Sequence, residues 1–438
     1  MLIIFVDAEL IKNGTSYLVS DNKLTGTSLE VLSFVVGGIQ QNQTFNDGID
    51  GRSRLYAGSE DKFRRITLNV KGDAYDIHDI SHLRNAINEL FDGEFYIREK
   101  RIKSVDVEYE SLGQKTGELN IGKPEYVNGQ QHKVVKVNAI DHEELLSNEF
   151  VVELETTDLP YGESVYTTKE LNDTGLSALA EKYGLVDGID DEKTQYTFYG
   201  EPYNENLLGD SDKIYNNADS NIANYPIKEE IKVGEKVTIS IYGQLGSGRV
   251  SFILYNTSAS SADYKVGRVF PEDFDDELGA YVATFSWPAG ANSELRVIQQ
   301  PSSATSSTTI TKIKLERGEK VTPFENPGNT KTSFSVFNAG NVTVEPESMY
   351  IYITLGLVTT DGSLKLSNKT TGETFAFNKA VSNRNIYLDG MNVMEGTAIN
   401  ALRNTNRQRI KLVPGVNNFE VTGAAFSQIT FNFKFYYK

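Results

Sequence analysis

The stretch KIKLERGEKVTPFENPG, Lys312 to Gly328, joins two kinds of chain and decides how the sequence is divided. Ile313 and Leu315 alternate with charged residues, which is the period-two pattern of a half-buried strand. The glycines and prolines that follow stop this strand, and a new alternation begins soon afterwards in TSFSVFNAGNVTVEP. We therefore predict that the stretch closes one domain and leads into the next.

Length and composition limit the class of protein. A chain of 438 residues is too long for one ordinary core, so we expect two to four domains. A hydrophobic content of 39% is sufficient for folding, and the lack of cysteine excludes disulfides, thiolate metal sites and cysteine nucleophiles. The apolar run after Met1 is too short for a signal peptide, and no later run is long enough to span a membrane. These features predict a soluble protein that is made in a cytoplasm.

The net charge of -17 is unevenly distributed along the chain. Residues 1–199 contain 20 Lys and Arg against 35 Asp and Glu, residues 200–328 contain 12 against 18, and residues 329–438 contain 11 against 7. Solubility is one explanation of the acidic first segment. The alternative is a surface that must not bind a polyanion, because attraction to phosphates requires positive charge. Both interpretations argue against direct, sequence-reading binding of nucleic acid.

Local patterns predict a mainly β fold with minor α. The first segment has strand-like runs around one helix, DISHLRNAINELFDG, in which we expect Asp79 to cap the helix and Gly93 to end it. Its apolar stripe consists of Ile80, Leu83, Ile87 and Leu90. A second helical patch, LSALAEKYGL, follows near the end of this segment. The middle segment has many short strands without helices, which favours a jelly roll or β-sandwich, and the last segment again contains only strands and turns.

Candidate catalytic and metal-binding groups are sparse, and we predict no enzyme and no cofactor. His78 and His82 have the spacing of a metal pair on a helix, but the glutamate of the zinc-protease motif is lacking. The acidic stretch PEDFDDELG contains Asp273, Asp275 and Asp276. An acidic surface loop is the simplest interpretation, calcium binding is the alternative, and glycosidase chemistry is a third.

The last segment resembles the carboxy-terminal, galectin-like domain of distal tail proteins from long-tailed phages (siphophages) of Gram-positive bacteria. The matching motifs are VFNAGNVTVEP (Val336 to Pro346), YLDGMN (Tyr387 to Asn392) and LVPGVNNFEVTG (Leu412 to Gly423). Each supplies turn residues in a strand frame. The first segment is similar to the belt domain of the same family through FRRITLNVKG, the capped helix and FYIREKRIKSVDVEYE, although it lacks the usual opening of the family.

The middle segment resembles the carbohydrate-binding jelly rolls that are common in phage tail proteins. Such modules often begin with NLL, here Asn206 to Leu208, and often end in a KLE-G-TP-aromatic strand, here Lys314 to Phe324. We therefore expect three domains: a β-rich, ring-forming belt with one or two helices (1–202), an inserted β-sandwich jelly roll (203–328) and a galectin-like β-sandwich (329–438).

The resemblance implies a structural protein of the virion, located at the distal end of the phage tail. The belt would form a homohexameric ring that joins the tail tube protein to the tail-tip and baseplate proteins, and genome DNA would pass through without specific binding. The galectin-like domains would face outward and hold receptor-binding or other baseplate proteins, and no membrane is involved. The alternative is a tail-tip receptor-binding adhesin without a channel-forming role.

The inserted jelly roll is the expected adhesion module, with host cell-wall polysaccharide as its ligand. Sugars present C–H faces that stack on aromatic rings. The candidate contacts are Trp287, which is the only tryptophan, and Tyr255, Tyr264 and Tyr281. Core packing is the alternative role for each of these rings.

Overall fold

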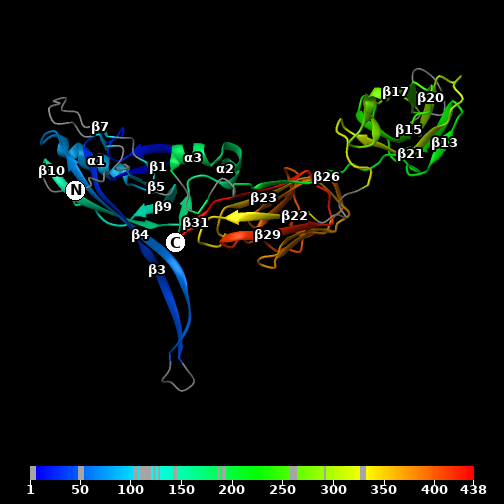
Figure 1. Cartoon of the computed structure of the whole chain (residues 1–438). Helices are drawn as coiled ribbons and strands as arrows, with labels where there is room; N and C mark the ends of the chain where they lie inside the picture. The colour runs from blue at the N-terminus through cyan, green and yellow to red at the C-terminus, as the bar shows by residue number, and fades with distance from the viewer. Residues whose placement is uncertain are drawn as a thin grey trace.

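The computed structural model describes residues 6–47, 54–101, 129–141, 146–184, 188–189, 194–256, 264–290, 293–325 and 332–438, and the backbone of short strands at 107–108, 120–121 and 125–126. Strands dominate this part of the chain, which confirms the predicted mainly β fold with minor α. Figure 1 shows three bodies in a row: an amino-terminal belt, a carboxy-terminal sandwich and a separate module. No helix in the described ranges is long and apolar enough to cross a membrane.

The belt is one antiparallel sheet in the order β2-β1-β5-β9-β10-β4-β3, with helix α1 on one face. Its elements are β1 (Val6–Lys12), β2 (Thr15–Leu18), β3 (Leu29–Asp47), β4 (Arg54–Asp73), α1 (Asp79–Leu90), β5 (Glu94–Arg101), β9 (Gln130–Lys136) and β10 (Ser147–Thr156). Two short strands, β6 (Val107–Glu108) and β7 (Asn120–Ile121), pair with each other, and β8 (Glu125–Tyr126) pairs with β5. Part of the predicted FYIREKRIKSVDVEYE run lies outside the described residues.

Helix α1 follows the predicted stripe, but its cap differs from the prediction. Ile87 and Leu90 are buried against the sheet, as an apolar stripe requires. Asp79 is in the first turn and does not cap the helix, because His78 occupies the N-cap position. The carboxylate of Asp76 accepts hydrogen bonds from the backbone N–H groups of His78 (2.7 Å) and Asp79 (3.1 Å). The local aspartate that satisfies these amides therefore lies two residues before the N-cap.

Strands β3 and β4 extend far beyond the belt sheet as a two-stranded arm (Figure 1). They contain 19 and 20 residues, and none of the residues at 35–47 or 54–63 is buried. The strands approach closely at Gly37, where a Cβ atom would lie 2.9 Å from the carbonyl oxygen of Arg65. A shift in register between Val36 and Ile39 marks the place where the arm leaves the sheet.

The carboxy-terminal sandwich has two antiparallel sheets, and part of it comes from before the predicted boundary at 202. The sheet orders are β12-β30-β23-β26-β27-β28 and β22-β29-β24-β25. Its strands are β12 (Thr197–Tyr199), β22 (Thr332–Asn338), β23 (Ile351–Thr360), β24 (Leu364–Asn368), β25 (Thr374–Phe377), β26 (Val381–Asp389), β27 (Asn392–Glu395), β28 (Ile399–Asn400), β29 (Gly415–Thr422) and β30 (Gln428–Phe433). Tyr166, Leu171, Leu179 and Tyr196 belong to the same core cluster as these strands.

Two helices bring those residues to the sandwich. α3 (Leu176–Tyr183) is the predicted second helix, whereas α2 (Thr168–Thr174) was not expected. The signal for α2 is the capping box at its start: the Thr167 hydroxyl accepts from the Glu170 N–H, and the Glu170 carboxylate accepts from the Thr167 N–H.

The inserted module lies between β12 and β22, so that both neighbouring strands belong to the sandwich. Its two sheets have the orders β13-β21-β15-β19-β18 and β14-β20-β16-β17. The strands are β13 (Tyr215–Asn217), β14 (Asn221–Pro226), β15 (Lys236–Gln244), β16 (Ser251–Tyr255), β17 (Lys265–Val269), β18 (Phe274–Asp275), β19 (Ala280–Ser286), β20 (Glu294–Gln300) and β21 (Thr308–Arg317). Ile239, Phe252 and Leu254 are buried in its core, whereas Val282 is only half-buried. The predicted boundary at 328 lies outside the described residues.

The KLE-G-TP motif forms a buried latch that holds the two ends of the module together. Lys314 and Glu316 lie on the face of β21 that points away from the module core, yet both side chains are completely buried and their charged groups are 3.3 Å apart. The Lys314 ammonium donates to the Thr322 hydroxyl (2.6 Å) and the Pro323 carbonyl (2.6 Å). Burial lowers the pKa of Lys314 to about 8, and Glu316 opposes this change.

The incoming segment of the module meets the same latch. The Tyr203 ring lies 4.3 Å from the Lys314 ammonium, and the Asn204 N–H donates to the Thr322 hydroxyl (3.0 Å). The ends of the module are therefore side by side, which lets a complete domain be inserted into one loop of another.

The latch predicts a specific pattern of stability. Lys314→Met should lower the unfolding free energy of the module by about 3–5 kcal/mol, because Glu316 then remains as an unpaired buried charge. The double variant Lys314→Met/Glu316→Leu should recover most of this loss. Unfolding in urea can be followed by the fluorescence of Trp287, which is the only tryptophan and reports on the module alone.

Lys312→Met is the matched control, because Lys312 is on the same strand and its ion pair with Glu325 (3.2 Å) is exposed. It should change stability by less than about 1 kcal/mol. If Lys312→Met and Lys314→Met lowered the unfolding free energy of the module equally, the proposed role of the buried Lys314–Glu316 pair would be wrong.

Candidate assembly and ligand surfaces

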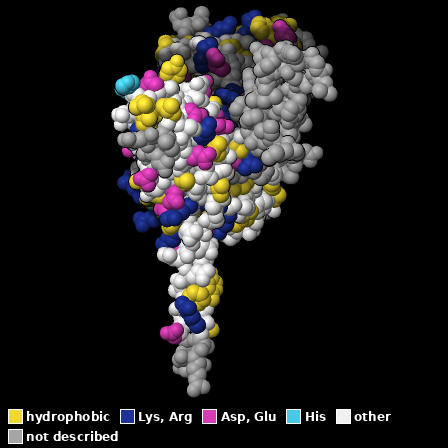
Figure 2. Space-filling model, turned by 90° about the vertical axis from the view of Figure 1, so that its left-hand side faces the viewer, with side chains coloured by type: hydrophobic (Ala, Val, Ile, Leu, Met, Phe, Trp, Pro, Cys, Tyr) yellow, Lys and Arg dark blue, Asp and Glu magenta, His cyan; other side chains and the backbone are white. Residues whose placement is uncertain are grey.

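An apolar cluster lies near the outer end of the arm. Phe45 of β3 is paired with Tyr56 of β4, and their rings meet edge to face with centroids 5.7 Å apart. Leu55 and Tyr56 are 59% and 60% exposed, and the Arg54 guanidinium lies 3.9 Å from the centroid of the Phe45 ring. Figure 2 shows the arm projecting from the belt. A few apolar and charged side chains stand out on its surface, which otherwise consists of uncharged polar side chains and backbone. This cluster has the aromatic and arginine composition that is enriched at protein interfaces.

The arm lacks the packing that normally stabilises a β-ribbon. An isolated two-stranded hairpin is at best marginally stable in water, and a third strand or a covering layer is usually required. In the outer arm both faces are exposed, so neither is covered by the rest of this chain. An extended ribbon with an aromatic tip is therefore suited to contact with another molecule.

The base of the arm is fixed by Asp61. Its carboxylate accepts hydrogen bonds from the Gln41 amide (2.6 Å) and the Tyr161 hydroxyl (2.8 Å), and it pairs with the Lys438 ammonium (2.7 Å). These contacts, that of Lys438 above all, lower the pKa of Asp61. Lys438, which directly follows β31, thus contacts the base of the arm through Asp61.

The belt and the sandwich are joined by backbone pairing. Strand β31 (Tyr436–Tyr437) pairs with β11 (Gly162–Ser164), and β11 in turn pairs with β9 of the belt. The Lys434 ammonium lies 2.6 Å from the Glu163 carboxylate beside this pairing. The chain therefore leaves the sandwich after β30 and joins the belt sheet through β31 and β11.

Trp287 is a core residue of the inserted module. Only 2% of it is exposed, and it packs in the hydrophobic cluster of the module. In this position Trp287 presents no ring face to solvent, so the predicted stacking on sugar has no surface there. The alternative role that the sequence allowed, core packing, is the one that the structure describes.

The three candidate tyrosines are half-buried and do not form one platform. Tyr255 ends β16, whereas Tyr281 is in β19 of the other sheet. Tyr281 lies between Phe252 and Phe274, with centroid distances of 5.3 and 4.9 Å. The Tyr264 carbonyl accepts from the Asn256 N–H (3.0 Å) and so closes the loop before β17. Whether these rings contact sugar stays a prediction.

Two exposed rings were not among the sequence candidates. Phe270 and Phe274 are 36% and 39% exposed and flank the short turn at Pro271–Asp273. The available signal in the sequence was the position of these phenylalanines on either side of Pro271 in an acidic stretch, where turn residues favour a surface loop.

The acidic residues of this stretch act in turns. Asp273 accepts from the Phe270 N–H (2.8 Å), and Asp275 accepts from the Glu277 and Leu278 N–H groups (3.0 Å each). Asp276 is exposed. Within the described ranges, no group of three or more His, Asp or Glu residues is arranged to hold a metal ion. Calcium binding at these aspartates therefore stays a prediction.

The comparisons with known proteins give distant structural likenesses. No protein-family model and no curated protein matches the sequence. One similar solved structure is the Dit protein of phage SPP1, described as a paradigm of the hub adsorption apparatus in phages that infect Gram-positive bacteria (8% identity, TM-score 0.35, 98% of this chain and 99% of that chain). Another is the baseplate of phage P2 in its activated conformation with calcium (7% identity, TM-score 0.29, 98% of each chain).

A third likeness is to the tandem carbohydrate-binding domain CBM22-1-CBM22-2 of a Paenibacillus barcinonensis protein (12% identity, TM-score 0.17, 54% of this chain and 98% of that chain).

The burial of Trp287 predicts that its removal affects folding. Trp287→Ala should lower the unfolding free energy of the module by about 3–5 kcal/mol, as expected for loss of a large core side chain. Calorimetry of the full chain measures this change. Val233→Ala, at a residue of the same module that is 72% exposed, should have almost no effect. A stable Trp287→Ala protein would contradict the core role.

Proposed function

We propose that this chain is a structural protein of a phage virion, a hub at the distal end of the tail. In this proposal the belts of six copies form a ring that joins the tail tube protein to the tail-tip and baseplate proteins, with genome DNA passing through the centre. The sandwich faces outward and holds receptor-binding or other baseplate proteins. The inserted module adds adhesion to polysaccharide of the host cell wall.

The observation that carries the proposal is the order of the parts. The parts are a belt sheet with a long arm, a sandwich from which the chain returns to the belt sheet through β31, and a module inserted in one loop of the sandwich. Together they contain the described parts of the segments in which family motifs occur. The motifs VFNAGNVTVEP and LVPGVNNFEVTG lie around β22 and β29, which are paired neighbours in one sheet. The resemblance therefore rests on residues that also meet in space.

The arm supplies a means of ring closure. A ring requires a heterologous interface, in which one surface of a copy contacts a different surface of the next copy and the rotation closes. The arm tip is one such surface. The second is the face of the belt sheet opposite α1, where Val35 and Val151 are 52% and 42% exposed. The apolar tip and this partly apolar face complement each other.

Charge on that face is mixed. Glu149, Glu153 and Glu155 of β10 lie beside Lys71, Thr67 and Arg65 of β4, and the Arg65 guanidinium pairs with Glu155 at 3.0 Å. Interleaved charges favour specific contact between copies more than an acidic lining for DNA. A predominantly negative lumen stays a prediction for the assembled ring.

The first test of the proposal is assembly. The purified protein should form hexamers, or two stacked hexamers, in light scattering and electron microscopy at micromolar concentration. Phe45→Ser/Tyr56→Ser should raise the concentration needed for assembly by about tenfold or more, because aromatic anchors dominate interface energies. The control Ile214→Ser removes an equally exposed apolar residue from the inserted module (68% exposed) and should leave assembly unchanged. Strict trimers of elongated shape would support the adhesin instead.

The second test is adhesion. Replacement of 204–326 with a short Gly/Ser linker should leave rings intact, because few contacts of the incoming segment cross to the sandwich, among them the Thr359 hydroxyl donating to the Tyr203 carbonyl (2.9 Å). The shortened protein should no longer sediment with host cell walls, whereas intact rings should, through several weak sites acting together. A chelator added to the intact ring tests whether calcium contributes. If intact rings with a folded module bind no wall fraction, the adhesion role is wrong.

A further inference from the structure

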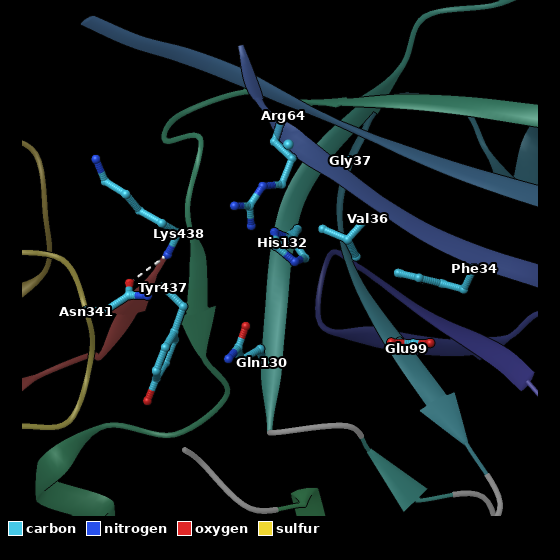
Figure 3. A pocket seen from close by; sticks show the side chains of 11 residues that line it. Phe34, Val36, Gly37, Arg64, Glu99, Gln130, His132, Asn341, Tyr437 and Lys438 are labelled. Atoms are coloured by element: carbon cyan, nitrogen blue, oxygen red, sulfur yellow. Dashed lines mark hydrogen bonds between the residues drawn. The ribbon is translucent and has the colours of Figure 1, made fainter. Parts of the chain in front are cut away.

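A cavity of about 480 Å³ lies where the belt meets the sandwich, and its chemistry is unusual. The core-side face of the belt supplies Arg64 and His132, and the sandwich supplies Asn341 and the last two residues of the chain. Figure 3 shows Arg64, His132 and Gln130 extending into the same space, opposite Tyr437 and Lys438. The cavity is thus built from two of the three bodies.

Arg64 is mostly buried and forms no ion pair among the described residues, although the Asp61 carboxylate lies near enough to act on its charge. The residue is only 7% exposed, and its side-chain Nε atom has no hydrogen-bond partner among the described residues. Its backbone N–H is occupied by the Thr156 hydroxyl (2.9 Å), which fixes the strand and directs the side chain into the cavity. Burial lowers the pKa of Arg64, the Asp61 carboxylate opposes this change, and an arginine remains charged at physiological pH. A largely buried guanidinium without an ion pair is costly unless another group helps to neutralise it.

The nearby carboxylates are already engaged. Asp61 is held by Lys438, Gln41 and Tyr161, as described above. Glu99, which lines the cavity, forms an ion pair with Arg101 at 2.5 Å. Among the described residues that line the cavity, Arg64 is therefore the charged side chain that forms no ion pair.

The remaining groups add hydrogen-bonding capacity. His132 is buried, its Nδ1 atom has no partner among the described residues, and burial and Arg64 lower the pKa of His132 to about 3. The imidazole is therefore neutral and offers one N–H. Gln130 lines the same wall with an amide group, and Gly38 borders open space, because no atom lies within 4 Å of the place where its Cβ would be.

We propose that this cavity binds a small oxoanion, a phosphate or a carboxylate, with Arg64 as its charge partner and His132 and Gln130 as neighbouring donors. The planar guanidinium matches two oxygens of such a group at once. The oxoanion has two sources that share this chemistry: a free anion in solution, or an Asp or Glu side chain of a second copy of this chain. In both cases the bound group neutralises Arg64 and ties the belt to the sandwich.

The test compares two adjacent arginines on opposite faces of β4. Calorimetric melting is measured with inorganic phosphate and with acetate, against sodium chloride of equal ionic strength, for wild type, Arg64→Gln and Arg65→Gln. Phosphate or acetate should raise the melting temperature of wild type and of Arg65→Gln, and Arg64→Gln should weaken the apparent affinity by about tenfold or more. Arg64→Lys keeps the charge without the planar fork, so it should bind at an intermediate affinity and shows that the site itself survives substitution.

The second source gives a different result. If a carboxylate of another copy occupies the cavity, free anions will not stabilise the assembled protein, but Arg64→Gln will weaken its assembly in light scattering. The control for assembly is Arg268→Gln, at an exposed arginine of the inserted module, which should leave assembly unchanged. The proposal is wrong if Arg64→Gln behaves like Arg65→Gln in the anion titration and like Arg268→Gln in the assembly measurement.

Discussion

The pairing of β31 with β11 is the contact on which the architecture depends. It joins Gly162 to Tyr437 by backbone hydrogen bonds between segments that are far apart in the chain. Backbone pairing is directional, so it fixes the angle between belt and sandwich as well as their distance. Two ion pairs, Lys434 with Glu163 and Lys438 with Asp61, lie beside it. Tyr166 and Tyr196, which precede the sandwich strands β12 and β22, are buried in the sandwich core and add to this connection. The module is joined to the sandwich by its incoming and outgoing segments.

The sequence predicts the local elements better than the contacts between them. The stripe of α1 and the alternation of Ile313 and Leu315 are periodic signals, and the structure follows both. Periodicity says which side chains face a core, but it does not say which core. Tyr166 and Tyr196 therefore could not be assigned to the sandwich from their neighbours in sequence. Trp287 shows the same limit at a candidate site, because an aromatic beside a turn is equally compatible with a ligand surface and with the burial that the structure describes.

Lys314 and Glu316 lie on a strand that the sequence predicts correctly, but the environment of their side chains differs from the prediction. Charged residues at alternate positions predict a solvated face, yet both side chains are completely buried because the incoming and outgoing segments of the module cross over them. This sheet face holds the ends of the module and so offers no open platform for a ligand. Exposed rings occur instead near the turn that contains Phe270 and Phe274. At such a buried position, apolar residues of similar volume would often be as stable as the ion pair.

Asp61 links the arm to the region where the belt meets the sandwich. Its carboxylate contacts Gln41 on one strand of the arm and Lys438 at the end of the sandwich, so the direction of the arm is set by the same residues that close the belt onto the sandwich. A neighbouring molecule held by Phe45 and Tyr56 is consequently held in a fixed orientation to the sandwich. Arg64 lies three residues further along β4, where the same strand enters the cavity. An anion bound in the proposed site would therefore contact the strand that carries the arm, close to the residues that join the belt to the sandwich.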